Sequence, residues 1–163
     1  MKKLKQELVQ DKIMDVKTLT NLVEGWRIKG QKIVFTNGCF DILHHGHVAL
    51  LLQAAELGNR LVLGINTDSS VKKLKGESRP INNEASRALL LAAQLYVDAV
   101  VLFDEDTPLE LIQALKPDVI VKGGDYTPET VVGNDFVKTY GGETVIIPLV
   151  DGFSTTGLIA KMK

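Results

Sequence analysis

The chain has 163 residues, the length of one domain, and a formal net charge of −1. Hydrophobic residues make up 45% of the sequence and charged residues 24%, which are ordinary globular values. This charge balance argues against a broad nucleic-acid surface, and without an apolar run of membrane-spanning length no association with a membrane is expected. The single cysteine excludes an internal disulfide. The absence of disulfides and of a visible signal segment favours a cytoplasmic protein.

The N-terminal residues, 1–30, are predicted to form a helical extension. Apolar residues recur at helical spacing from Leu4 to Trp26, and Asp15 interrupts them where it can cap a second helical segment. The N-terminal helices, with Trp26, are a candidate dimer contact. The rest of the chain, 31–163, is expected to form the main domain.

From residue 32 onward, short apolar runs alternate with helical patterns. Strands are predicted near residues 32–36, 61–65, 98–102, 118–121 and 144–147. Helices are predicted near residues 47–57, 68–75, 84–95, 108–115, 128–139 and 154–162. The alternation predicts an α/β fold: a Rossmann-like, doubly wound, mostly parallel five-stranded sheet with helices on both faces. Ligands of such sheets bind beyond the carboxyl ends of the strands, where the strand order reverses.

The most informative segment runs from Thr36 to His47. The first apolar strand ends at Asn37-Gly38, a turn signal, and a helical pattern follows. Backbone N–H groups at a helix start attract anions, and His44 and His47 are three residues apart, hence on one face. This arrangement suits phosphate binding and stabilisation of charge on phosphoryl oxygens. The alternative is structural: one histidine caps the helix and the other is buried and hydrogen-bonded.

Three residues close to the histidine pair also bear on this site. Gly46 permits a ligand to approach the backbone closely. Asp41 has three open roles: capping the helix, which is favoured, orienting a histidine, or holding a metal. Cys39 is interpreted as a small buried residue rather than a nucleophile.

A cationic segment follows the second predicted strand. Lys72, Lys75 or Arg79 can reach a triphosphate bound at the carboxyl ends of the strands. The alternative is a solvated surface, which is the usual explanation of a charge run.

Two later segments are expected at the same edge of the sheet. The glycine pair within Lys122–Tyr126 permits backbone contact with a base or a sugar, or it forms a tight turn into the next helix. The hydroxyls of Ser154–Thr156 cap the last helix or hold phosphate oxygens. Neither a Walker A nor a G-x-G-x-x-G pattern occurs, so a P-loop NTPase or an NAD dehydrogenase is not expected.

Together these segments resemble the H-x-G-H nucleotidyltransferase superfamily, and within it the adenylyltransferase domain of bacterial ADP-heptose synthase. The resemblance extends from about Asp15 to the C-terminus. The segments that carry it are, in chain order, Thr36–Asp41, His44–His47, Lys72–Gly76 with Arg79-Pro80, Lys122–Tyr126 and Ser154–Thr156.

The resemblance implies transfer of AMP from ATP to D-glycero-β-D-manno-heptose 1-phosphate, giving ADP-heptose and pyrophosphate for lipopolysaccharide core biosynthesis. The implied cofactor is Mg²⁺, bound together with ATP. The implied nucleotidyltransferase domain consists of residues 31–163. In many bacteria this domain is fused behind a sugar kinase, so the chain is expected to be the stand-alone form. Its expected partners are a second copy, in a homodimer, and a separate heptose kinase.

The resemblance also implies roles for single residues. His44, His47 and Lys72 are the implied catalytic residues, contacting the triphosphate. The implied nucleotide-binding residues are Thr36, Asn37, Gly38, Cys39, Phe40, Asp41, Gly46, Lys75, Lys122, Gly123, Gly124, Asp125, Tyr126, Ser154, Thr155 and Thr156. No metal ligand is implied. In one departure, the basic residue after Ser154–Thr156 is Lys161, where the superfamily often has an arginine, and lysine lacks the planar fork of arginine.

The chemistry agrees with this set of residues. A sugar phosphate has a second pKa of about 6 and is largely ionised at neutral pH, so it needs no general base. Catalysis then depends on positioning and charge stabilisation. Two alternatives stay open: another nucleotidyltransferase, such as a glycerol 3-phosphate cytidylyltransferase, and a nucleotide-binding regulatory module without turnover.

Overall fold

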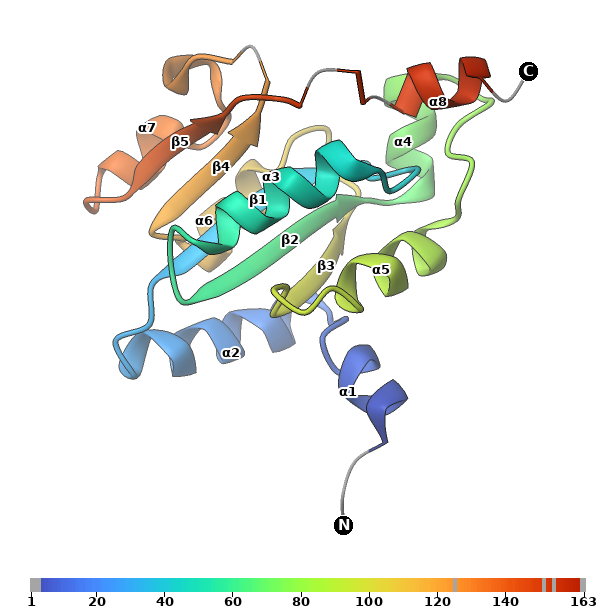
Figure 1. The fold of residues 1–163 in the computed structure, drawn as a ribbon. Coiled ribbons are helices and arrows are strands. Elements are labelled where there is room, and N and C mark those ends of the chain that lie inside the picture. Colours follow the sequence, from blue (N-terminus) through green and yellow to red (C-terminus); the bar gives the residue numbers. More distant parts are fainter. Residues whose placement is uncertain (1–3, 125, 151, 154, 162–163) are drawn as a thin grey trace.

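The computed structural model describes residues 4–124, 126–150, 152–153 and 155–161. At its centre is a five-stranded parallel sheet with the strand order β3-β2-β1-β4-β5 (Figure 1). The strands are β1 (Ile33–Gly38), β2 (Arg60–Asn66), β3 (Ala99–Phe103), β4 (Val119–Gly123) and β5 (Glu143–Ile147). The predicted strands and the α/β fold are therefore confirmed, and the pairing between all neighbouring strands is parallel.

Helices cover both faces of the sheet. They are α1 (Lys5–Gln10), α2 (Val16–Ile28), α3 (His45–Ala55), α4 (Asp68–Lys75), α5 (Glu84–Ala92), α6 (Leu109–Leu115), the 3₁₀ turn η1 (Pro128–Thr130), α7 (Asn134–Lys138) and α8 (Thr155–Lys161). The predicted break between the first two helices is confirmed, since the Asp15 carboxylate accepts a hydrogen bond of 2.8 Å from the Thr18 N–H at the start of α2. No helix in the described part of the chain is both long and apolar enough to cross a membrane.

The prediction of a single helix over residues 128–139 is wrong. The chain forms η1, then a turn at Gly133 with φ 89°, and only then the short helix α7. A Cβ at Gly133 would lie 2.8 Å from Cδ1 of Ile112, so the backbone passes too close to α6 for a side chain. This close approach between distant segments divides the helix, and local sequence pattern does not report it.

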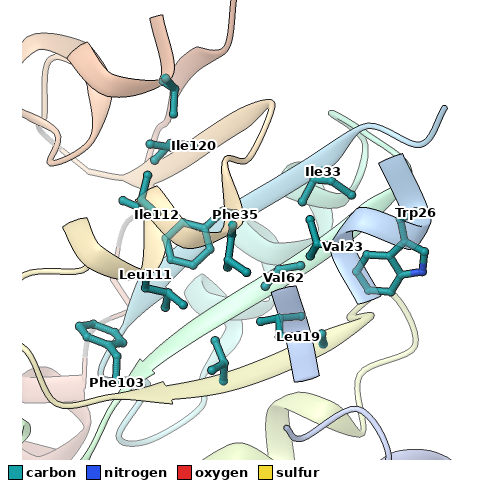
Figure 2. Packing of buried hydrophobic residues seen from close by; sticks show 14 of the residues in the cluster. Leu19, Val23, Trp26, Ile33, Phe35, Val62, Phe103, Leu111, Ile112 and Ile120 are labelled. Carbon is teal, nitrogen blue, oxygen red and sulfur yellow. The ribbon is translucent and has the colours of Figure 1, made fainter. Parts of the chain in front are cut away.

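Two apolar cores lie on opposite faces of the sheet. On one face, α2, α6 and α7 pack against alternate side chains of the strands, and Figure 2 shows Phe35 and Val62 of the sheet in one cluster with Leu19 and Leu111 of the helices. On the other face, α3 and α5 cover the intervening strand residues, including Val34. Burial on both faces explains why the strands are continuous apolar runs.

The N-terminal segment packs on this sheet. The Val100 N–H in β3 donates to the Lys12 carbonyl at 2.8 Å, and the Met14 N–H donates to the Val100 carbonyl at 3.1 Å, so this segment continues the sheet beyond β3. Trp26 is largely buried within the protomer, where the Arg60 guanidinium lies 5.2 Å from its ring centroid. Trp26 therefore contributes to the core and presents little surface for a dimer contact.

Candidate functional site

The strand order reverses between β1 and β4, and a cavity of about 430 Å³ opens beyond the carboxyl ends of the strands at this point. Its walls come from the β1–α3 turn, the ends of β2, β3 and β4, the last turn of α4 with the loop that follows, and the start of α8. The sheet thus places the ligand cavity where the sequence predicted it.

The β1–α3 turn forms the floor of this cavity. A Cβ at Gly38 would lie 3.2 Å from the Phe40 ring, so the missing side chain lets that ring fold back over the turn. Phe40 itself has φ 47°, a left-handed conformation that is strained for a bulky residue and that the surrounding packing must hold. Its largely buried ring meets His47 edge to face, with the ring centroids 5.1 Å apart.

His44 and His47 form a stacked pair at the start of α3. Their ring centroids lie 3.8 Å apart with an interplanar angle of 20°, and Nδ1 of His44 accepts a long hydrogen bond of 3.4 Å from the His47 N–H. His44 is thus the cap that the structural alternative foresaw. His47 differs from that alternative in its location, since the residue is half-buried at the cavity wall. Only His47 of the two lines the cavity.

The histidine pair is uncharged at neutral pH. Burial, with a smaller effect from His44, lowers the pKa of His47 from 6.5 to about 4, and burial also lowers the pKa of His44. A neutral imidazole still donates one N–H. The pair therefore offers hydrogen bonds to a ligand, and the positive charge of the site must come from lysine and arginine side chains.

Gly46 has a packing role in this helix start. It is buried, and a Cβ there would lie 3.1 Å from Cε1 of His44 and 3.4 Å from Cβ of Phe153. The space beside Gly46 is therefore occupied by the protein's own side chains, among them the capping imidazole.

Asp41 does not cap α3, and the favoured prediction for it is wrong. Its buried carboxylate accepts hydrogen bonds from Nε of Arg79 at 2.5 Å, from the Ile81 N–H at 2.7 Å and from the Asn82 N–H at 2.9 Å. His44 takes the capping position instead. Asp41 fastens the loop after α4 to the β1–α3 turn and so keeps Arg79 on the cavity wall.

Lys122 at the end of β4 brings a half-buried cation to the opposite wall. Its Nζ lies 3.3 Å from both the carbonyl oxygen and Oδ1 of Asn37 and 5.8 Å from the ring centroid of Tyr126. Burial lowers the pKa of Lys122. The glycine pair that follows allows close packing: a Cβ at Gly123 would lie 3.1 Å from Leu50, and Gly124 has φ 111°.

The structure brings most of the predicted residues to one cavity. Those on its wall are Asn37, Gly38, Cys39, Phe40, Asp41, His47, Lys75, Lys122, Tyr126, Thr155 and Thr156. Those that do not line it are Thr36, His44, Gly46, Lys72, Gly123 and Gly124. Lys72 is exposed on α4, and Thr36 is buried inside β1. Two predicted residues, Asp125 and Ser154, lie outside the described residues.

Several wall residues were not singled out from the sequence. They are Asn66, Leu74, Phe103, Asp106 and Pro108. Asn66 and Phe103 are the last residues of β2 and β3, so the rule that ligands bind beyond the carboxyl ends of strands could have found them. Cys39, predicted to be buried, is half-buried on the wall, and burial raises the pKa of its thiol.

The chain is similar to known proteins over most of its length. Residues 35–159 match the family described as cytidylyltransferase-like. The chain is similar to the bifunctional protein HldE of Caulobacter vibrioides, with 60% identity over 151 residues that cover 93% of this chain and 31% of that protein. It is also similar to HldE of Gluconobacter oxydans, with 52% identity over 98% of this chain and 34% of that protein. The chain thus spans about a third of the length of these relatives.

Two solved structures share the architecture. The lipopolysaccharide core biosynthesis protein from Thermoplasma volcanium is 28% identical with a TM-score of 0.58, covering 74% of this chain and 98% of that one. The pantoate-beta-alanine ligase of Francisella tularensis, solved with beta-gamma ATP and beta-alanine, has a TM-score of 0.63 over 91% of this chain and 76% of that one. Since its identity is 15%, the second likeness shows a common fold alone.

Proposed function

The chain belongs to the cytidylyltransferase-like family, and on this premise we propose that it transfers AMP from ATP to D-glycero-β-D-manno-heptose 1-phosphate. The products are ADP-heptose and pyrophosphate, for lipopolysaccharide core biosynthesis. The observation that carries the proposal is the meeting of His47, Lys75, Lys122 and Thr155 at one cavity, although they lie far apart in the sequence. The sugar phosphate is supported by the sequence resemblance, by the high identity to HldE and by the name of the Thermoplasma protein.

In the proposed complex, ATP lies along the cavity between β4 and the start of α3. Lys122, Asn37 and Tyr126 are placed to border the nucleoside. His47 donates a hydrogen bond from its neutral ring to a phosphoryl oxygen, and Lys75 supplies positive charge. This division of roles follows from the pKa of His47, which leaves its ring uncharged at neutral pH.

The reaction is an in-line displacement at the α-phosphorus. A phosphate oxygen of the sugar phosphate forms the new P–O bond, and the bond to the bridging oxygen of pyrophosphate breaks. Arg79 is placed to neutralise the leaving pyrophosphate: its Nε donates to Asp41, and the side chain lines the cavity, so its terminal nitrogens can meet the departing oxygens. This role would replace the arginine that the superfamily often has after Ser154–Thr156.

The proposal includes Mg²⁺ bound with ATP. Among the described residues, no group of three or more His, Cys, Asp or Glu side chains could hold a metal ion by itself. Of the two aspartates on the cavity wall, Asp41 is hydrogen-bonded to the loop after α4 and Asp106 is exposed. This donor set fits an ion held mainly by phosphate oxygens, with Asp106 as its protein ligand. When bound, the ion neutralises charge on the phosphates.

The test is release of pyrophosphate by the purified protein with ATP, Mg²⁺ and the heptose 1-phosphate. His47→Ala should lower kcat by roughly 10²–10³-fold, the loss of one transition-state donor. His45→Ala is the matched control, since His45 is exposed on the same helix and does not line the cavity. Activity of His47→Ala within threefold of wild type would contradict the assigned role.

Two other outcomes would replace the proposal. Faster turnover of CTP with a polyol phosphate would favour a cytidylyltransferase, and tight nucleotide binding without pyrophosphate would favour a regulatory module. The proposed homodimer and separate heptose kinase are tested by light scattering and by co-purification. The relatives named HldE are described as bifunctional, which supports the proposal that a second activity accompanies the adenylyltransferase.

A further inference from the structure

Arg87 on α5 is a fully buried cation, and the reaction described above does not use it. Its Nη1 donates to the Cys39 carbonyl at 2.7 Å, its Nε to the Asn82 carbonyl at 3.0 Å and its Nη2 to Oδ1 of Asp68 at 2.8 Å. Burying a charge is costly unless it is paired and hydrogen-bonded, and here three acceptors surround one guanidinium.

The three acceptors lie in three segments, each of which carries a residue on the cavity wall. Cys39 lies in the β1–α3 turn, which leads to the histidine pair. Asp68 is the first residue of α4, whose last turn carries Lys75. Asn82 follows the loop that holds Arg79, and its side-chain amide donates to the Asp41 carbonyl at 2.7 Å.

We propose that Arg87 is a positioning residue that fixes the histidine turn, the cationic helix α4 and the Arg79 loop relative to one another. The inference rests on the proposed function. Its physical basis is the planar fork of arginine, which meets several acceptors in fixed directions, whereas the ammonium of lysine is a point charge without that geometry. Arg87 does not line the cavity, so it acts through the residues it holds.

The discriminating variant is Arg87→Lys, which keeps the charge and loses the fork. We expect its kcat to fall by about 10–100-fold, because small misplacements of the groups around a reacting phosphate are costly even when they originate outside the site. Its Kd for ATP, measured by calorimetry, should rise by about fivefold, so that kcat changes more than binding.

Arg60→Lys is the matched control. Arg60 is also paired, with Nη1 2.7 Å from Oδ1 of Asp98, and it donates to Gln31 at 2.9 Å, but it lies at the start of β2, at the end of the sheet away from the cavity. Its kcat and ATP affinity should stay within twofold of wild type. Both variants are compared per folded molecule, with thermal unfolding recorded for each.

Chemical rescue gives a second readout. Methylguanidinium, at a concentration that leaves wild type unaffected, should raise the activity of Arg87→Ala at least tenfold and leave Arg60→Ala unchanged. A lowered Tm with kcat and Kd within twofold of wild type in Arg87→Lys would overturn the inference, as would failure of both Arg87 variants to fold. If wild type itself releases no pyrophosphate, the proposed function fails, and ATP affinity alone decides on Arg87.

Discussion

Replacing His47 by asparagine should reduce the loss of stability that the protein undergoes when the pH falls from 6.5 to 4. The His47 ring is packed against Phe40 and stacked on His44, and burial lowers its pKa from 6.5 to about 4. In the unfolded chain the same imidazole titrates near 6.5. As the pH falls, the unfolded state binds the proton before the folded state does. The contribution of His47 to the free energy of unfolding is therefore fully present above pH 6.5 and decreases progressively as the pH falls from 6.5 to 4.

The size of this effect follows from the shift in pKa. One unit corresponds to about 1.4 kcal/mol, so full protonation of the unfolded chain favours unfolding by roughly 3 kcal/mol at pH 4 and by roughly 2 kcal/mol at pH 5. These are upper values, since the His47 ring retains some contact with solvent at the cavity wall. Even a loss of 2 kcal/mol is a large share of the roughly 5–15 kcal/mol that stabilises a domain.

The assay is urea denaturation of wild type and His47→Asn at pH 7 and at pH 5. Carboxylates contribute to acid destabilisation in both proteins, so the informative quantity is the difference between their two losses. This difference should be about 1–2 kcal/mol in favour of the variant, below the upper value because the ring keeps some contact with solvent. His45→Asn, on the exposed side of the same helix, should behave as wild type. Equal losses in wild type and His47→Asn would refute the reasoning.

Three further substitutions test other parts of the structure. Asp41→Asn removes the charge from a buried hydrogen-bonded carboxylate and should cost about 3 kcal/mol in urea denaturation; a cost near zero would contradict its fastening role. Gly133→Ala should cost about 2 kcal/mol, because its φ is 89° and the new Cβ would meet Ile112, whereas Gly25→Ala, with nothing within 4 Å, should not destabilise. Thermal unfolding compares the two glycine variants. Lys122→Met should weaken ATP binding by about tenfold in calorimetry. An unchanged Kd for ATP would show that the Lys122 ammonium does not contact the nucleotide.

The elements whose signals are local were predicted well. The apolar runs around Phe35 and Val62 are strands because each is covered on both faces. Asp15 caps α2 through a contact three residues away, which lies within the reach of a sequence pattern. The histidine spacing likewise placed His44 and His47 on one face at the start of a helix.

The wrong predictions share one physical cause. The role of Asp41 depends on Arg79 and the loop after it, and the break at Gly133 depends on contact with α6. Lys72 and Lys75 occupy the same helix, but only Lys75 reaches the cavity wall, because the orientation of α4 on the sheet selects its side chain. Contacts between distant segments decided each of these outcomes.

The sequence by itself determined where the strands and most of the helices lie and where the helix that follows the histidine turn starts, since capping, turn chemistry and apolar periodicity act over a few residues. The tertiary structure decided the strand order, which sets β1 beside β4 and thereby brings His47 and Lys122 to one cavity. It also lowered the pKa of the histidines, because the burial that shifts His47 exists only once Phe40, His44 and the helix start have packed together.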